Sequence, residues 1–441
     1  MLARRDELGA TMDFDIPAEL QDLLGEIDAF IAADIKPLEE ENDNIRFFDH
    51  RRENARTDWD NGGVPRQDWY ALLRQMRDRA DQAGLLRWAL PSELGGRGGS
   101  NLGMAIIREH LAAKGLGLHN DLQNESSIVG NFPTVLMVHN VGTESQRKWC
   151  EPMITGDMRL AFGLTEPDHG SDATWLETAA YRDGEEWVIN GKKRFNTGLD
   201  TATHDMIFAR TSGNQGEANG ITCFVVPTDT PGFNVDFMWW TFNMPSEHAE
   251  LTLDNVRVSG PDCILGGEGK GLEMANMFVH ENRIRQAASG VGAAQFCVDE
   301  SVAYAKHRHV FGKPLWRNQA VQFPLAEMQT RCEMVRNLVY KTAWNLDRNH
   351  HMQVSDKVSM ANYQANRLVC EAADLAIQVH GGIGYTRHKP FEHIYRHHRR
   401  YRITEGSEEI QIRRVAQRLF GVDVKRPDDP NVIGRSAPGA V

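Results

Sequence analysis

The feature that most constrains the fold of this 441-residue chain is that the spacing of its apolar residues changes twice. Up to about residue 157, apolar residues such as Leu20, Leu23 and Ile27 recur at three- and four-residue intervals, which is the period of an amphipathic helix. From 158 to 270 they form short runs between turn-forming pairs, which indicates strands. From 271 onward helical spacing returns. Helices, then strands, then helices predict segregated elements rather than alternating β-α-β units.

We therefore predict an α+β protein of three domains: an N-terminal helical domain at 1–157, a middle β domain at 158–270 and a C-terminal helical domain at 271–441. The length agrees, because a domain typically has about 150 residues. Within the first domain, residues 42–63 are polar and lack periodicity, which is typical of a loop or insertion. In the middle domain, Asn190-Gly191 is the strongest turn signal, and it predicts a type I′ hairpin between 187–189 and 193–196.

Composition excludes several classes of protein. The chain has 49 Lys and Arg against 61 Asp and Glu, a net charge of −12, which argues against a general affinity for nucleic acid or anionic membranes. No apolar run approaches the roughly 18 residues of a membrane span, and the first residues lack the apolar core of a signal peptide, so we expect a cytoplasmic protein. The six cysteines are scattered without a Cys-x-x-Cys pair, and we expect them to be reduced and mostly buried.

The segment 165–172, Thr-Glu-Pro-Asp-His-Gly-Ser-Asp, opens the β domain with hydroxyl, acidic and glycine residues. A capped turn is the ordinary explanation. The functional interpretation is a cradle of hydroxyls and backbone groups for the polar edge of a cofactor, with Gly170 permitting close approach. Two further glycine-rich turns, at 266–271 and 381–384, match neither a dinucleotide-binding fingerprint nor a phosphate-binding P-loop. They are better explained as helix ends.

Two features near the C-terminus have competing explanations. His393 and His397 have the spacing of one helix face, but without a His-Glu-x-x-His pattern a metal is disfavoured, and the surrounding arginines are better suited to carboxylates or phosphates. Ser407 fits a helix N-cap, but this leaves the preceding Glu405-Gly406 unexplained. A carboxylate at such a turn, if held in an apolar cleft, has a raised pKa and can act as a base.

Taken together, seven segments resemble, in order and spacing, the motifs of the flavin-dependent acyl-CoA dehydrogenase family, over nearly the whole chain. They are residues 91–100, 164–173, 193–198, 283–292, 308–313, 378–384 and 401–411. The resemblance implies an N-terminal helical domain, a middle β domain and a C-terminal four-helix bundle, with FAD between the last two. It also implies an acyl-CoA substrate, electron-transfer flavoprotein as the electron acceptor, and a homodimer or homotetramer.

The resemblance also implies roles for individual residues. Thr165 and Thr197 correspond to residues that hydrogen-bond the flavin ring, and Phe195 to the residue that covers its face. Gly170 and Ser171 lie where the flavin phosphates and the thioester ligand approach. Residues expected to reach the FAD of a neighbouring subunit are Arg308, Phe311, Gln378, Gly381 and Gly382, whereas Ser407 and Glu409 are expected near the FAD of their own subunit.

For the reaction, the resemblance implies that Glu405 removes the α-proton of a saturated acyl-CoA while flavin N5 accepts the β-hydride, giving the trans-2-enoyl-CoA. Arg283 and Gly406 are expected to contribute to the substrate site together with Glu405 and Ser171. Some family members carry the base immediately before the arginine that matches Arg283. Here that position is Asn282, which cannot abstract a proton, so Glu405 is favoured.

Several features depart from the family pattern or leave alternatives open. Phe195 replaces the usual Trp, and His397 stands where an aspartate is common. One rival is an oxidase on the same fold, which passes electrons to oxygen. A second rival is a noncatalytic flavin- or acyl-CoA-binding protein in which Glu405 only caps a helix. Chain length, branching and ring character of the substrate do not follow from the motifs.

Overall fold

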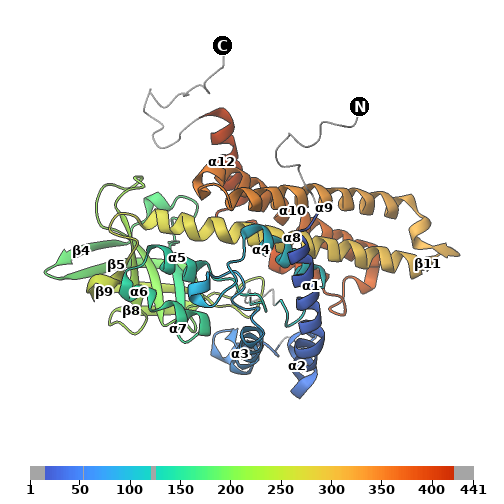
Figure 1. Cartoon of the computed structure of the whole chain (residues 1–441), viewed down its shortest axis with the longest axis horizontal. Coiled ribbons are helices and arrows are strands. Elements are labelled where there is room, and N and C mark those ends of the chain that lie inside the picture. The colour runs from blue at the N-terminus through green and yellow to red at the C-terminus, as the bar shows by residue number, and fades with distance from the viewer. Residues whose placement is uncertain (1–14, 53, 121–125, 422–441) are drawn as a thin grey trace, which may run out of the picture.

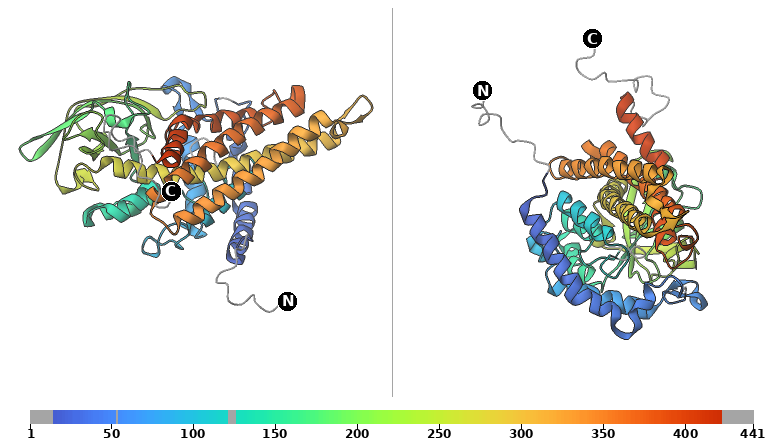
Figure 2. Two further views of the ribbon diagram at one scale, coloured as in Figure 1. Left: turned by 90° about the horizontal axis from the view of Figure 1, so that it is seen from above. Right: turned by 90° about the vertical axis from the view of Figure 1, so that its right-hand side faces the viewer.

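The computed structural model describes residues 15–52, 54–120 and 126–421. A twisted β sheet lies at one end, long C-terminal helices extend away from it, and the N-terminal helices lie alongside both (Figure 1). Seen along the bundle, the N-terminal helices curve around one side of it (Figure 2). The structure thus has the predicted order of helical, β and helical parts.

The N-terminal part is helical because its apolar residues form stripes that pack into one core. Leu23 and Ile27 of the first helix, and Trp69, Leu72 and Met76 of the third, are buried. The helices are α1 (Ala18–Phe30), α2 (Lys36–Glu40), α3 (Gln67–Gln82), α4 (Asn101–Ala113), α5 (Pro133–Val141), α6 (Glu144–Arg147) and α7 (Cys150–Thr155).

The segment predicted to be a polar loop, 42–63, is more ordered than expected. It contributes a 3-10 helix (Glu41–Phe47) and a short strand β1 (Thr57–Asp58), which pairs with β2 (Val64–Pro65). Phe47 is buried against Trp69, with ring centroids 5.1 Å apart, and the Arg56 guanidinium lies 4.2 Å from the Trp69 ring centroid. One aromatic and one cationic side chain therefore anchor a segment whose composition is otherwise polar.

The middle part is an eight-stranded sheet with the order β10-β7-β6-β4-β5-β9-β8, and β3 pairs in parallel with β6. Its strands are β3 (Leu160–Gly163), β4 (Ala179–Asp183), β5 (Glu186–Thr197), β6 (His204–Arg210), β7 (Ile221–Pro227), β8 (Phe233–Met238), β9 (His248–Ser259) and β10 (Ile264–Leu265). The two longest strands, β5 and β9, pair antiparallel along almost their whole length. The last residue of β5, Thr197, pairs with the first residue of β9, His248, and the candidate site begins at this edge of the sheet.

The predicted hairpin at Asn190-Gly191 is wrong. Both residues lie inside β5, and the register of β5 on β9 is irregular between Ile189 and Gly191. Gly191 has φ +153°, and a Cβ there would lie 2.4 Å from the Thr178 hydroxyl. The Asn-Gly pair therefore provides a bulge and a close backbone approach rather than a chain reversal. The turn instead lies at Gly184, between β4 and β5.

The C-terminal part consists of long helices around a core rich in alanine and valine. They are α8 (Gly271–His307), α9 (Gln319–Leu346), α10 (Ser355–His380), α11 (Phe391–Arg400) and α12 (Glu408–Phe420), with a small hairpin of β11 (His309–Val310) and β12 (Lys313–Pro314) after α8. The small side chains let α8 and α10 pack closely. Gly290 of α8 lies against the backbone of Ala365 in α10.

The cysteines and the apolar character of the helices agree with the composition. All six cysteines are free thiols and all are buried, as predicted. Among the described residues, none of the helices combines the length and the apolar character needed to cross a lipid bilayer.

Candidate active site

The loop that follows β3 carries three of the predicted site residues. Thr165 is half-buried, whereas Gly170 and Ser171 are exposed. The backbone N–H of Arg194 donates to the Thr165 carbonyl oxygen at 2.9 Å, so this loop lies against the end of β5. A Cβ placed on Gly170 would meet only the Thr165 methyl group, at 4.0 Å, which leaves open space for a ligand.

A buried ion pair between Lys193 and Glu166, which the sequence did not reveal, anchors the 164–178 loop to β5. Lys193 Nζ donates to Glu166 Oε1 at 2.8 Å, and both side chains are almost fully buried, with 0% and 4% exposed. Lys193 Nζ also donates to the Leu164 carbonyl oxygen at 3.2 Å. The backbone N–H groups of Glu177 and Thr178 donate to the same carboxylate at 2.5 and 2.9 Å. One ion pair thereby joins both ends of the 164–178 loop to β5.

The ionisation of this pair follows from its surroundings. Burial alone favours the neutral acid, but the Lys193 cation and the Glu177 N–H outweigh it, so the pKa of Glu166 lies below its ordinary value. Burial lowers the pKa of Lys193, and the Glu166 carboxylate opposes this shift. Nearby, burial raises the pKa of Asp205 to about 7, although Asn196 donates to its carboxylate at 2.5 Å.

Phe195 and Thr197 lie at the end of β5, beside the 164–178 loop. Phe195 has φ +60° and 51% of its side chain is exposed, with its ring centroid 5.6 Å from that of Trp239. Thr197 Oγ1 lies 3.0 Å from His248 Nδ1. Burial lowers the pKa of His248 to about 4, helped by Arg400, so this imidazole is neutral at pH 7. An exposed aromatic face beside an oriented hydroxyl suits a planar ligand with a polar edge.

Glu405 lies in the turn between α11 and α12 with φ +58°. Nε and Nη2 of Arg283, on α8, both donate to its carbonyl oxygen, the Nε bond at 2.9 Å. Its carboxylate Oε1 accepts from Asn282 Nδ2 at 3.5 Å. Burial lowers the pKa of Arg283 to about 10, and Glu405 opposes this shift. Two adjacent residues of α8 therefore hold the backbone and the side chain of the predicted base.

The residues after Glu405 hold the turn in place. Gly406 has φ +86°, and a Cβ there would come within 2.7 Å of Arg283 Nη2, so this position requires glycine. Glu408 forms ion pairs with Arg402 at 2.8 Å and Arg367 at 3.1 Å. Ser407 stands at the N-cap of α12, as predicted, although its side chain makes no capping hydrogen bond. Ser407 is half-buried and Glu409 is exposed.

Positive φ angles concentrate at the predicted site residues. Among the described residues, six that are not glycine have positive φ, and Phe195, Phe311 and Glu405 are three of them. Such a conformation is uncommon for a phenylalanine or glutamate, and it persists only where the surroundings impose it. Backbone strain of this kind is typical of functional sites.

Two contacts join the sheet to the helices of the C-terminal part. The Phe162 ring of β3 stacks on Phe278 of α8, with centroids 4.6 Å apart, one helical turn before Asn282. Arg396 of α11 donates to the carbonyl oxygen of Phe242, in the loop between β8 and β9, at 3.3 Å. These contacts place the sheet against α8 and α11, the helices that carry Asn282 and lead into the Glu405 turn.

The remaining predicted residues gather at the far end of the bundle. Arg308 and the fully exposed Phe311 lie at the hairpin after α8, while Gln378, Gly381 and Gly382 lie at the end of α10. The Tyr304 and His380 rings stack with centroids 4.3 Å apart, which places these two helix ends side by side. At 1.5 Å per residue, α8 separates Asn282 from this end by roughly 40 Å. The far-end residues therefore do not reach the Glu405 region of their own chain.

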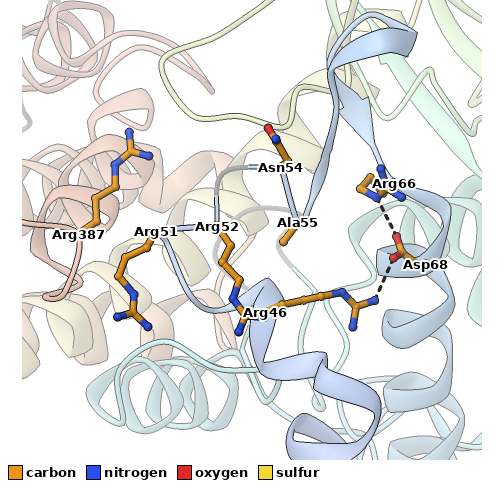
Figure 3. Close-up of a pocket in the computed structure, with 8 residues that line it drawn as sticks. All are labelled: Arg46, Arg51, Arg52, Asn54, Ala55, Arg66, Asp68 and Arg387. Atoms are coloured by element: carbon orange, nitrogen blue, oxygen red, sulfur yellow. Dashed lines mark hydrogen bonds and ion pairs between the residues drawn. The ribbon is translucent and has the colours of Figure 1, made fainter.

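A separate basic cavity of 670 Å³ lies beside the 42–63 segment (Figure 3). It is lined by Arg46, Arg51, Arg52, Asn54, Ala55, Arg66, Asp68 and Arg387. Several of these arginines already pair with carboxylates, for example Arg46 and Arg66 with Asp68. None of the predicted site residues lines this cavity.

Comparisons with known proteins assign the family. The chain matches the models of the N-terminal domain of acyl-CoA dehydrogenases at residues 45–157, the middle domain at 161–256 and the C-terminal domain at 269–420. A 3-(aryl)acrylate reductase of Clostridium sporogenes is 35% identical over 350 residues, which are 77% of this chain and 88% of that protein. Subunit CarC of the caffeyl-CoA reductase-Etf complex of Acetobacterium woodii is 31% identical over 77% of this chain and 87% of its own length.

Solved structures agree with this assignment. A putative acyl-CoA dehydrogenase from Mycobacterium abscessus superposes with a TM-score of 0.80 at 29% identity, covering 92% of this chain and 99% of that one. A glutaryl-coenzyme A dehydrogenase in complex with glutaryl-CoA superposes with a TM-score of 0.76 at 27% identity, covering 93% of this chain and 98% of that one. The chain belongs to the acyl-CoA dehydrogenase family, whose members are flavoprotein oxidoreductases acting on CH–CH bonds.

Members of this family bind FAD, and the residues present here fit that cofactor. The exposed Phe195 ring offers a face for a planar ring system, and the hydroxyls of Thr165 and Thr197 lie on the two segments that border it. Gly170 leaves room beside Thr165. At the far end of the bundle, Cβ atoms on Gly381 and Gly382 would meet nothing within 4 Å, so these exposed positions leave room for a ligand.

Proposed function

We propose that this protein oxidises a saturated acyl-CoA thioester to its trans-2-enoyl-CoA, with Glu405 as the base that removes the α-proton. The observation that carries the proposal is the Glu405 turn, whose backbone is held by Arg283 and whose carboxylate is contacted by Asn282. FAD, when bound, supplies the acceptor for the β-hydride. The noncatalytic alternative, in which Glu405 only caps a helix, has less support because Ser407 and not Glu405 occupies the N-cap of α12.

The chain's own residues each have a role in this proposal. The backbone N–H of Glu405 is suited to donate to the thioester carbonyl oxygen, which would stabilise the enolate character that develops as the α-proton leaves. Arg283 fixes the adjacent peptide group by holding the Glu405 carbonyl oxygen, and Gly406 lets this arginine approach. Ser171, on the open side of the 164–178 loop, lies where it can contact the ligand.

The electron acceptor and the acyl group can be tested together. We propose electron-transfer flavoprotein as the acceptor, supported by the CarC relative, whose name places it in a complex with Etf. A panel of butyryl-, octanoyl-, glutaryl- and 3-phenylpropanoyl-CoA, assayed with electron-transfer flavoprotein, measures both acceptor and preference. The aryl compound belongs in the panel because one relative is named a 3-(aryl)acrylate reductase. Stoichiometric hydrogen peroxide in air, with no transfer to the flavoprotein, would instead identify an oxidase.

Replacing Thr197 with valine should shift the visible spectrum of bound FAD while leaving the chain folded. The substitution removes one hydroxyl near the surface, which costs roughly 1 kcal/mol of folding free energy. The spectrum of the purified holoprotein is the measurement. Thr252→Val is the matched control, because Thr252 is a threonine of the same sheet whose hydroxyl donates to Asp236 at 2.8 Å. Identical spectra for Thr197→Val and the unaltered protein would contradict the assigned contact.

Replacing Arg308 with alanine should weaken FAD retention and lower the apparent melting temperature together. We propose a homodimer or homotetramer in which Arg308 and Phe311 of one chain reach the FAD of another, because α8 carries them roughly 40 Å from the Glu405 region of their own chain. A ligand that binds only the assembled protein stabilises it by mass action. Equilibrium FAD binding and a melting curve at several protein concentrations test this. Lys306→Ala, an exposed cation two residues away, is the control.

A further inference from the structure

A chain of hydrogen bonds runs from a buried arginine to the carboxylate of Glu405. Nη1 of Arg285, on α8, donates to Oδ1 of Asn131, which lies just before α5. Nδ2 of Asn131 donates to Oδ1 of Asn282 at 3.2 Å, and Nδ2 of Asn282 donates to Oε1 of Glu405 at 3.5 Å. This series of hydrogen bonds joins three separate segments of the sequence and ends on the proposed base.

The chemistry of the two ends fixes the direction of every bond in this chain. A guanidinium can only donate hydrogen bonds, and an ionised carboxylate can only accept them. Each asparagine between them must therefore present its oxygen toward Arg285 and its NH₂ toward Glu405. In this orientation the dipoles of both amides point the same way, so each bond strengthens the next.

Two residues of this hydrogen-bond series are largely shielded from water. Asn282 and Arg285 are 6% and 4% exposed, so little water can replace a lost partner. Arg285 also forms an ion pair with Glu281, one helical turn earlier, so its charge is compensated within α8. The Nε of Arg285 is buried without a hydrogen-bond partner in the structure, so the side chain is held by its Nη groups.

We infer that Asn282 is a positioning residue for the reaction, and that Asn131 and Arg285 act through it to hold the Glu405 carboxylate in one orientation. The inference rests on the proposed role of Glu405 as the base. Arg283 holds the Glu405 backbone through its carbonyl oxygen, whereas Asn282 contacts the carboxylate itself. Arg283 therefore fixes the backbone of Glu405, and Asn282 fixes its side chain. A general base acts efficiently only when its oxygen is held near the proton it removes.

The test measures flavin reduction by rapid mixing of the FAD-loaded protein with the acyl-CoA that reduces it fastest in the panel above. Asn282→Ala should lower the limiting rate of reduction by roughly 10- to 100-fold, the cost expected when a reacting group is displaced by a fraction of an ångström to an ångström. The acyl-CoA concentration at half-maximal rate should change little. Asn282→Gln, which keeps the NH₂ donor, should recover part of the rate. Asn131→Ala should lower it less.

Two comparisons separate positioning from a merely structural effect. Asn276→Ala is the control, because Asn276 lies on the same helix and donates only to the Leu272 carbonyl oxygen, at 2.7 Å. It should reduce normally. If Asn131 acts through Asn282, the double variant should be no slower than Asn282→Ala alone, because the second change then has nothing left to remove. Losses that multiply in the double variant would contradict the connected chain.

The result for Glu405→Gln, measured in parallel, distinguishes failure of this inference from failure of the proposed function. Loss of reduction in Glu405→Gln with a normal rate in Asn282→Ala overturns the positioning role and leaves the base assignment intact. Normal reduction in Glu405→Gln overturns both. A rate loss in Asn282→Ala accompanied by a parallel rise in the half-saturating acyl-CoA concentration indicates damaged binding and also overturns the inference.

Discussion

Glu405→Gln should bind FAD and acyl-CoA normally and yet reduce its flavin about 10²–10⁴-fold or more slowly, because losing a positioned general base has this effect. Glutamine keeps the size of the side chain and its ability to accept the hydrogen bond from Asn282 at 3.5 Å, so the turn should be preserved. Only the basicity is removed. Rapid mixing with saturating acyl-CoA measures the step directly, and a melting curve verifies the fold.

The control for this variant is Glu371→Gln on α10, an exposed glutamate that pairs with Arg331 away from the site. It should reduce at the normal rate. A second variant moves the carboxylate: Glu405→Gly combined with Asn282→Glu should recover part of the activity, because residue 282 already lies within hydrogen-bond distance of the Glu405 carboxylate. Near-normal reduction in Glu405→Gln would exclude it as the base.

The order of the three parts could be predicted because it depends only on local periodicity. Leu23 and Ile27, whose spacing predicted one face of a helix, are buried in α1, and the middle part is a sheet. The position of a turn was predicted less well from the types of its residues. Asn190-Gly191 satisfies the rule for a hairpin, but the close approach of Thr178 uses the missing Cβ of Gly191 for a bulge instead. A pair of residues cannot reveal which neighbour will pack against it.

In the candidate site, too, some residues could be predicted from the sequence and others could not. Glu405 and Thr197 were found because motifs mark them, but the groups that hold them come from distant segments. Asn131 and Asn282 are 151 residues apart in sequence, and Lys193 and Glu166 are 27 apart. Neither pair has a local pattern. The positive φ angles of Phe195 and Glu405 could not be predicted either, because neither residue type favours that conformation.

Lys193→Met should destabilise the protein by about 3–5 kcal/mol, the usual cost of removing one partner of a buried ion pair. The Glu166 carboxylate would stay in a site that is 4% exposed, without its cation, while the N–H groups of Glu177 and Thr178 still bind it. Because the lost Lys193 bonds to Glu166 and to the Leu164 carbonyl oxygen tie this loop to β5, FAD should also be retained less well. Urea unfolding and the fraction of FAD bound measure the two effects.

Two further variants decide whether the effect belongs to the buried charge. Arg257→Met removes a cation from the same sheet, where it pairs with Asp183 and Glu186 at the surface, and it should leave stability essentially unchanged because exposed pairs contribute little. Lys193→Met combined with Glu166→Gln should recover part of the lost stability, since a neutral amide needs no counter-charge and its single oxygen still accepts one of the two loop N–H bonds. If the double variant is as unstable as Lys193→Met, the cost comes from lost packing of the lysine stem rather than from the uncompensated carboxylate.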